Sequence, residues 1–270
     1  MSLNPTLSRR ALVGGVLTIA AAPAAAHSSA FAWPQGKRAA VSLTYDDGLD
    51  SQLDYAIPQL DQAGLKATFF ITREASEARV ADWQSVARDG HEIEDHTDTH
   101  PCALKDYSAR RFERRQLDPM EHYLNDSFGA SNQRLFAFPC GFLGLGRGSR
   151  RERFGRYERL LSKRFEAART VNGPPNDPKR VVADRLHLSA FEPTYDADDP
   201  RAAYRYLDKA LRLGGWSILV FHDVLPSRRS EGDTSLRVHE QILTHIAKAD
   251  LWCAPMGEAF SYIYEHPALR

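Results

Sequence analysis

Short apolar segments alternate with longer amphipathic segments along the chain. The short segments are rich in β-branched and aromatic residues, which favour strands, and the longer ones repeat their apolar positions at the spacing of a helix. The predicted strands are 41–48, 66–71, 91–94, 135–138, 165–170, 216–221 and 251–254. The predicted helices are 51–65, 83–89, 108–128, 199–213, 235–248 and one that closes the chain.

This alternation of strands and helices predicts an α/β protein with a parallel sheet covered by helices. The repeated pattern favours a closed or nearly closed β/α barrel. In such a barrel the functional side chains follow the carboxyl ends of the strands. The residues at or just past predicted strand ends are Asp46, Asp47, His96, Pro139, Cys140, Gly141 and His222. We therefore expect them to meet at one mouth of the barrel.

Asp46 and Asp47 end the first predicted strand and are followed by Gly48. Neighbouring side chains of a regular strand point to opposite faces, so both carboxylates can share a site only if the chain turns there, which Gly48 permits. Two close carboxylates stay ionised together only when a cation lies between them. A turn with solvated acids has the same sequence, so other parts of the chain must decide.

His96 and His100 are four residues apart, a spacing that puts both imidazoles on one side of a helical turn and suits a divalent metal. Together with the two aspartates they make a site of two histidines and a carboxylate, with open positions for water and substrate. Catalytic zinc requires this arrangement. Zinc is the favoured ion, and cobalt, nickel or iron would fit the same ligands.

Four motifs occur in order: TYDDG at 44–48, HTDTH at 96–100, FPCG at 138–141 and VFHD at 220–223. Across roughly residues 33–264 they resemble the motifs of the polysaccharide deacetylase family (NodB homology, carbohydrate esterase family 4). The resemblance implies a single domain with an irregular (β/α) barrel. It also implies roles for five residues: Asp47, His96 and His100 as metal ligands, Asp46 as general base and His222 as general acid.

The backbone N–H of Cys140 is implied as the donor to the oxyanion, and its thiol is not needed for that role. The chain departs from the family pattern at Ala137, where many members have an arginine that pairs with the base. We expect Arg169, at the end of a predicted strand, to supply this cation. The Asp-Trp motif that orients the catalytic histidine has no clear match, and the candidates to replace it are Asp184, Asp196 and Asp198.

The leading functional hypothesis is a metal-dependent hydrolase that removes N- or O-acetyl groups from a polysaccharide. One alternative keeps the same site and acts on a small amide or cyclic imide. The other is a catalytically silent carbohydrate-binding protein, which the missing arginine at position 137 favours and the presence of both base and acid positions opposes. The sequence does not specify the glycan.

Length, composition and the N-terminal pattern indicate how many domains the chain has and where the protein is located. The 270 residues, 43% of them hydrophobic, suffice for one sizeable domain. Residues 1–26 are typical of an export signal, with Arg9-Arg10, a small-residue apolar run and a small-residue cleavage site, and residues 27–270 form the catalytic domain. The signal is twin-arginine-like, with an ordinary secretion signal as the rival, and predicts a periplasmic or extracellular protein. The apolar run is too short for a good membrane span.

Removing residues 1–26 takes away two arginines and no acid, which leaves 33 basic and 35 acidic residues, a net charge of −2. This balance does not indicate a nucleic-acid partner. Arginines are dense in residues 145–164, where they could meet an anionic polymer or form a solvated helix face.

The chain has three cysteines, which allow at most one intramolecular disulfide. Cys102 and Cys140 should both lie near the barrel mouth. We expect them to stay reduced, because a twin-arginine substrate folds in a reducing compartment and two strand-end residues rarely meet the required Cα separation.

Overall fold

The computed structural model of the chain describes residues 1, 31–131 and 133–269. Apart from Met1, the predicted export signal lies outside these residues, so it stays a prediction. Phe31–Arg270 forms one compact unit. None of the helices in the described residues combines the length and the apolar character needed to cross a bilayer.

Parallel strands form the central sheet of this unit, in the order β5-β4-β3-β2-β1-β6, with β9 also paired to β1. They are β1 (Ala39–Asp47), β2 (Thr68–Ile71), β3 (Glu92–Asp95), β4 (Leu135–Ala137), β5 (Ala167–Arg169), β6 (Trp216–Phe221) and β9 (Leu251–Cys253). The short strands β7 (Val224–Leu225) and β8 (Thr234–Ser235) pair separately.

Segment 188–191 spans the gap between the two outer strands of this order. Leu188 makes a parallel bridge with Arg169 of β5, and Phe191 makes one with Leu219 of β6. Thr170 N donates to the Leu188 carbonyl oxygen, and Phe191 N donates to that of Ile218. The curled sheet is therefore completed by irregular backbone, which confirms the irregular (β/α) barrel in its α/β class.

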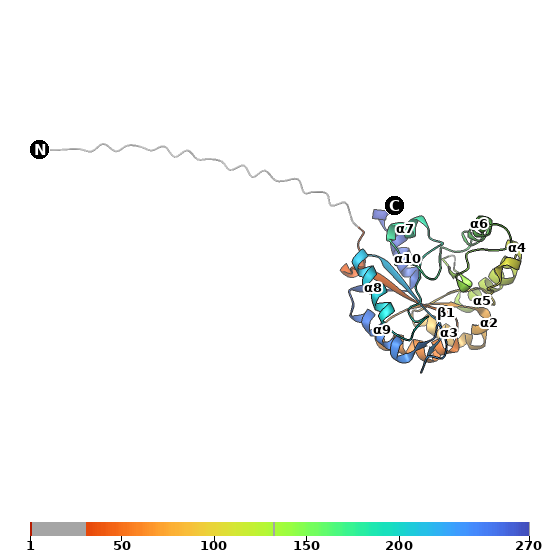
Figure 1. The fold of residues 1–270 in the computed structure, drawn as a ribbon, viewed down its shortest axis with the longest axis horizontal. Coiled ribbons are helices and arrows are strands. Elements are labelled where there is room, and N and C mark those ends of the chain that lie inside the picture. The colour runs from red at the N-terminus through yellow and green to blue at the C-terminus, as the bar shows by residue number, and fades with distance from the viewer. Residues whose placement is uncertain (2–30, 132, 270) are drawn as a thin grey trace. The chain divides into compact units, whose positions relative to one another are not determined.

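Helices surround the strands, and β1 lies in the middle of the ribbon (Figure 1). Their bounds are α1 (Ile57–Ala63), α2 (Arg73–Ser76), α3 (Val80–Arg88), α4 (Ala109–Phe112), α5 (Asp118–Phe128), α6 (Arg150–Leu161), α7 (Pro178–Ala183), α8 (Arg201–Leu213), α9 (Leu236–Lys248) and α10 (Met256–Glu265). The predicted helix 108–128 is α4 and α5, joined by the π-helical turn Glu113–Leu117 just before Pro119.

Helix α6 was not among the predicted helices, although a solvated helix face was one of the two interpretations of residues 145–164. Its first turn carries a capping box, in which Ser149 Oγ accepts from Glu152 N and the Glu152 carboxylate accepts from Ser149 N. One face of the helix buries Tyr157, Leu160 and Leu161. Charged side chains occupy most of the other positions of this helix, so its few apolar residues do not form a clear helical pattern in the sequence.

The alternation of side chains along β1 decides what enters the barrel. Val41, Leu43 and Tyr45 face outward into a core cluster with the surrounding helices. Ala40 packs inside with residues of the inner cluster, and Ser42 and Thr44 share its face by the period of two. Asp46 continues this inner row, so the strand itself delivers one carboxylate into the barrel mouth.

Candidate active site

Asp46 forms a buried ion pair with Arg169, the last residue of β5. Nη2 of Arg169 donates to Oδ1 of Asp46, and the guanidinium carbon lies 4.7 Å from the ring centroid of Phe70. Arg169 is fully buried, and its Nε and Nη1 have no hydrogen-bond partner within the described residues. A strand other than the one that carries Ala137 therefore supplies the cation. The contact proposed for Arg169 is present, and its effect on catalysis stays a prediction.

Asp47 reaches the same site because the backbone turns at Asp47 itself. The φ angles of Asp47 and Gly48 are both +78°, in the left-handed region. A Cβ added to Gly48 would lie 3.0 Å from Cβ of Ile71, so the backbone angle and the close approach both require glycine. The turn thus begins one residue before the glycine at which the sequence predicted it.

His96 and His100 follow β3 on an irregular loop and not on a helix. The loop has positive φ angles at Thr97 (71°) and at His100 (49°), and its imidazole centroids lie 4.6 Å apart. Asp95 Oδ1 accepts from Thr97 N at 2.7 Å, and Thr97 Oγ1 accepts from His100 N at 3.1 Å. The predicted helical turn is wrong, since left-handed residues held by side-chain acceptors bring the imidazoles together.

Asp47, His96 and His100 fit a divalent metal. Nε2 of each histidine lies 3.6 Å from Oδ1 of Asp47, and the three candidate ligand atoms are all within 4.8 Å of one another. This Oδ1 is buried and has no hydrogen-bond partner in the described part of the chain. Nδ1 of His96 donates to the Ala137 carbonyl oxygen at 3.0 Å, which leaves Nε2 unprotonated and available to a metal. This donor set suits zinc and also cobalt, nickel or iron.

The electrostatics of the site favour an ionised Asp46 and a neutral His96. Burial alone would raise the pKa of Asp46, but the Arg169 guanidinium, helped by His96 and His222, outweighs it and lowers that pKa. Burial lowers the pKa of His96 to about 4, and the nearby carboxylates oppose only part of this effect. A base and a metal ligand need these protonation states at neutral pH.

Pro139–Gly141 forms a tight turn that begins two residues after the end of β4. Cys140 has a φ of +54° and Gly141 a φ of +64°. A Cβ at Gly141 would lie 2.5 Å from Cγ2 of Val171, so only glycine fits there. The N–H groups that close the turn belong to Gly141 and the residue after it. The turn itself therefore does not use the N–H of Cys140.

Cys102 and Cys140 form a disulfide, with Cα atoms 5.8 Å apart, so the expectation that they stay reduced is wrong for the structure. Both residues leave neighbouring strands at the same edge of the sheet, and the left-handed turns at His100 and Cys140 direct the two loops toward each other. The bond ties the loop of His100 to the Pro139–Gly141 turn. Cys253 is the free cysteine.

His222 follows β6 at the same mouth. The side-chain amide of Gln52 donates to the backbone carbonyl oxygens of both Asp46 (2.5 Å) and His222 (3.3 Å), so it holds the ends of β1 and β6 together. Ser51, the residue before Gln52, donates from Oγ to Oδ1 of Asp223, the residue after His222, at 2.6 Å. Gln52 and Ser51 were not predicted as site residues, because an amide and a hydroxyl at the start of a helix have no chemical signature in the sequence.

Besides Asp46, Glu192 lies close enough to His222 for their charges to interact, and it was not predicted from the sequence. Burial raises the pKa of Glu192, and His222 opposes this rise. Three aspartates were proposed to orient His222. Asp184 instead accepts from Nδ1 of His187 at 2.7 Å, and Asp198 accepts from Ser235 N at 2.9 Å. Asp196 lines a pocket together with Glu192. The signal for Glu192 was its place directly after segment 188–191, which the alternation of strands and helices does not reveal.

Comparison with known proteins indicates one family and one fold. Residues 34–145 match the family described as "Polysaccharide deacetylase". A peptidoglycan-N-acetylglucosamine deacetylase of Bacillus cereus is 40% identical over 80 residues, which cover 29% of this chain and 29% of that protein.

Two solved structures share the fold at low identity. A family 4 carbohydrate esterase from Streptomyces lividans, in complex with acetate, has a TM-score of 0.54 and 17% identity over 81% of this chain and 93% of that one. A mutant of a CE4 family pseudoenzyme with restored enzymatic activity has a TM-score of 0.55 and 13% identity over 82% of this chain and 67% of that one.

The disulfide predicts the number of free thiols. Denatured, unreduced protein should contain one thiol that reacts with a thiol reagent, Cys253, and three after reduction. The variant Cys102→Ser should contain two reactive thiols without reduction, because Cys140 loses its partner. Three reactive thiols in the unreduced wild-type protein would contradict the bond.

Proposed function

This chain belongs to the polysaccharide deacetylase family, and from that membership and its site we propose that it is a metal-dependent hydrolase that removes acetyl groups from a polysaccharide. The observation that carries the proposal is the pairing of two adjacent aspartates in different environments. Asp46 is held by Arg169, while Asp47 turns an unpartnered oxygen toward His96 and His100.

In the proposed mechanism Asp47, His96 and His100 would hold a divalent metal, zinc by preference. When bound, such an ion would polarise the acetyl carbonyl and lower the pKa of a water to about 7. Asp46, which its lowered pKa keeps ionised, accepts a proton from the water whose oxygen bonds to the carbonyl carbon. Its position on the inner row of β1 aims it at the barrel mouth.

The other proposed roles belong to Cys140 and His222, which follow β4 and β6. The N–H of Cys140 donates to the oxyanion that develops on the acetyl oxygen. His222 donates a proton to the leaving nitrogen or oxygen, since imidazole exchanges a proton near neutral pH. Together these groups supply a base, an acid and an oxyanion donor around one carbonyl.

The alternative of a silent binding protein loses its main support. It rested on the missing motif arginine, whose place beside Asp46 is taken by Arg169.

We also propose export to the periplasm or beyond, in line with the predicted signal, because glycans of the cell wall and the exterior lie there. Acetate release from chitin, peptidoglycan, acetylated xylan and the glucosamine polymer of biofilms, with chelator and metal add-back, tests the activity. Small amides assayed beside these glycans separate it from small-amide hydrolysis. If none of these glycans released acetate in a chelator-sensitive reaction, the proposal would be overturned.

Loss of a ligand and loss of the base should have different results. His96→Ala should lose bound zinc and activity together. Asp46→Asn should keep zinc and lose activity by roughly 10²–10⁴-fold, which is the usual contribution of a positioned base. Metal content by mass spectrometry and acetate release, measured on the same preparations, check both outcomes. A zinc-free Asp46→Asn protein would mean that the two aspartate roles are reversed.

Arg169 should set the pH range of the reaction. Without its cation the pKa of Asp46 should rise, so a higher pH is needed to ionise the base. Arg169→Ala should therefore move the acidic limb of the kcat/KM profile to higher pH. Because this arginine is fully buried, thermal unfolding of the same protein must first show that it folds.

Arg169→Lys serves as the matched variant, since it retains a cation and should move the limb less. An unchanged acidic limb with near-normal activity in Arg169→Ala would show that Asp46 does not depend on this arginine.

A further inference from the structure

A pocket of about 430 Å³ opens beside the candidate active site, on the side of the disulfide. It is lined by Cys102, Ala103, Leu104, Lys105, Gly141, Phe142, Leu143, Gly144, Arg150, Arg153 and Phe154. Cys102 Sγ lies 3.9 Å from Nδ1 of the proposed metal ligand His100, and Gly141 follows the proposed oxyanion donor. A polymer bound with one unit at the metal can therefore extend directly into this pocket.

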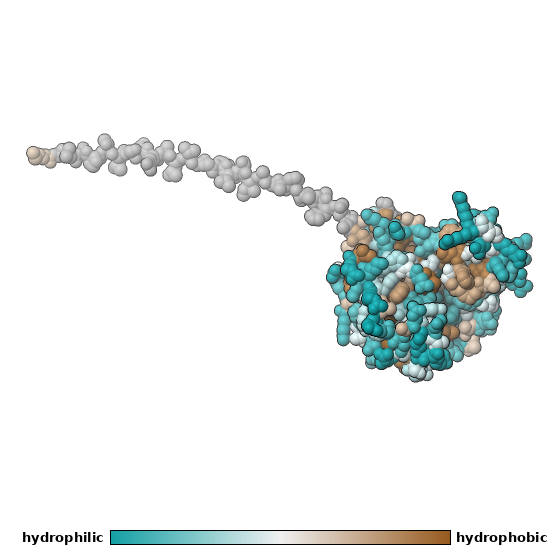
Figure 2. Space-filling view, viewed as in Figure 1, coloured by the Kyte–Doolittle hydropathy of each residue, from teal (hydrophilic) through white to brown (hydrophobic). Residues whose placement is uncertain are grey.

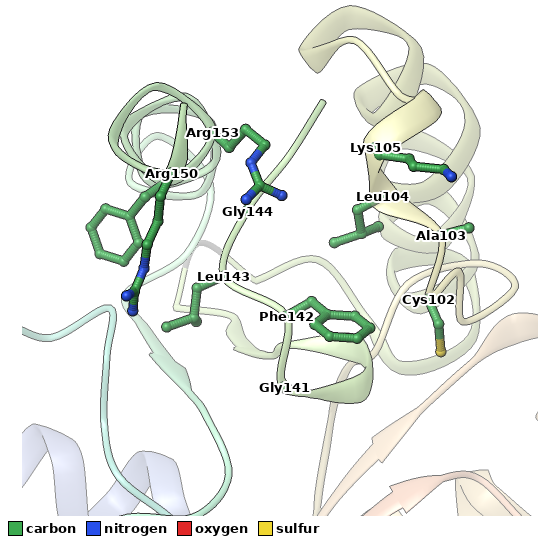
Figure 3. Close-up of a pocket in the computed structure, with 11 residues that line it drawn as sticks. Cys102, Ala103, Leu104, Lys105, Gly141, Phe142, Leu143, Gly144, Arg150 and Arg153 are labelled. Atoms are coloured by element: carbon green, nitrogen blue, oxygen red, sulfur yellow. The ribbon is translucent and has the colours of Figure 1, made fainter. Parts of the chain in front are cut away.

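The lining combines apolar walls with cations. Phe142 is 52% exposed, and in Figure 3 its ring stands between Leu143 and the Cys102 segment. Arg150 and Arg153 extend from α6 toward segment 141–144, and Lys105 lies on the opposite side (Figure 3). Figure 2 shows hydrophobic surface in the region of α5 and α6, bordered by hydrophilic side chains. Such a surface suits a ring with an apolar face and a negative group.

Arg150 and Arg153 of this pocket have no side-chain partner among the described residues, while the charge of Lys105 acts on Asp106. No side-chain hydrogen bond or ion pair joins Lys105, Arg150 or Arg153 to another described residue, no acid is among the lining residues, and Nε of Arg153 is buried without a partner. The nearby acids are engaged elsewhere, since Asp106 pairs with Arg147 at 3.0 Å and Glu152 accepts from its helix cap.

Some of the other arginines of residues 145–164 differ in this respect. Arg156 donates to the backbone carbonyl oxygen of Leu145 at 2.7 Å. Arg164 bonds to three carboxylates, those of Glu113, Asp118 and Glu121. Among the described residues, Arg150, Arg151, Arg153 and Arg159 of this segment have no side-chain hydrogen bond or ion pair, and of these four Arg150 and Arg153 line the pocket.

We propose that this pocket binds a carboxylate-bearing sugar unit next to the acetylated unit, so that the substrate is an acidic polysaccharide. The inference rests on the proposed deacetylase function and specifies its substrate class. Guanidinium groups bind carboxylates through paired, charge-assisted hydrogen bonds. A ring with one carboxylate fits the lining better than a polyanion does, because most of the lining side chains are apolar.

Oligomers of alternating N-acetylglucosamine and N-acetylmuramic acid test the proposal, since their lactyl carboxylates can be converted to neutral amides without a change of length. The metal-loaded wild-type protein should release acetate from the free-carboxylate form with a kcat/KM about tenfold higher than from the amidated form, mainly through KM. The double variant Arg150→Gln, Arg153→Gln should lose this preference and keep its activity on neutral chitin oligomers.

Arg159→Gln is the matched control, because Arg159 is exposed on the same helix and does not line the pocket. This variant should keep the preference. Equal rates on the carboxylate and amide forms in the wild type, or an unchanged preference in the double variant, would overturn the pocket assignment.

A binding measurement separates this inference from the deacetylase proposal. Calorimetric titration with the already deacetylated, carboxylate-bearing oligomer needs no catalysis. The wild-type protein should bind it about tenfold more tightly than the double variant does, and the difference should shrink at high salt. Absence of acetate release from every glycan, with this difference intact, would contradict the deacetylase function alone. Equal affinities of the two proteins would contradict the proposal that this pocket binds the carboxylate-bearing unit.

Discussion

The buried ion pair between Asp46 and Arg169 is the interaction on which the rest of the site depends. An ionised carboxylate next to a second carboxylate is unfavourable, and burial increases its cost. The guanidinium offsets this cost from inside the barrel, so Asp46 needs no metal of its own to stay charged. Asp47 is then left with a free oxygen between two imidazoles. The pair thus places two identical side chains in different chemical environments.

Around this pair, the mouth is built from backbone that an ordinary strand end does not adopt. Positive φ angles occur at Asp47, Thr97, His100 and Cys140, which are non-glycine residues on the loops that follow β1, β3 and β4. Each costs of order 1–3 kcal/mol and persists only where the surroundings hold it. Here side-chain acceptors, the Gln52 amide and the Cys102–Cys140 disulfide hold it. The strain is concentrated where the geometry of ligands and donors matters.

Periodicity and short motifs were enough to predict the barrel and the residues that meet at its mouth. Prediction from sequence failed where the cause is three-dimensional. The histidine spacing suggested a helical turn, but a loop with left-handed residues carries both rings. Glu192 lies on irregular backbone that joins the sheet edges, and the disulfide depends on how two loops turn. Arg169 could be proposed because a missing cation beside a buried base must be replaced.

The most direct measurement of the central claim is a crystal structure of the zinc-loaded protein with an anomalous difference map at the zinc edge. We expect one strong peak within bonding distance of Asp47, His96 Nε2 and His100 Nε2, with Asp46 still bound to Arg169. A peak coordinated by Asp46 with the Arg169 contact broken, or zinc held by His100 with the two cysteines, would contradict the claim.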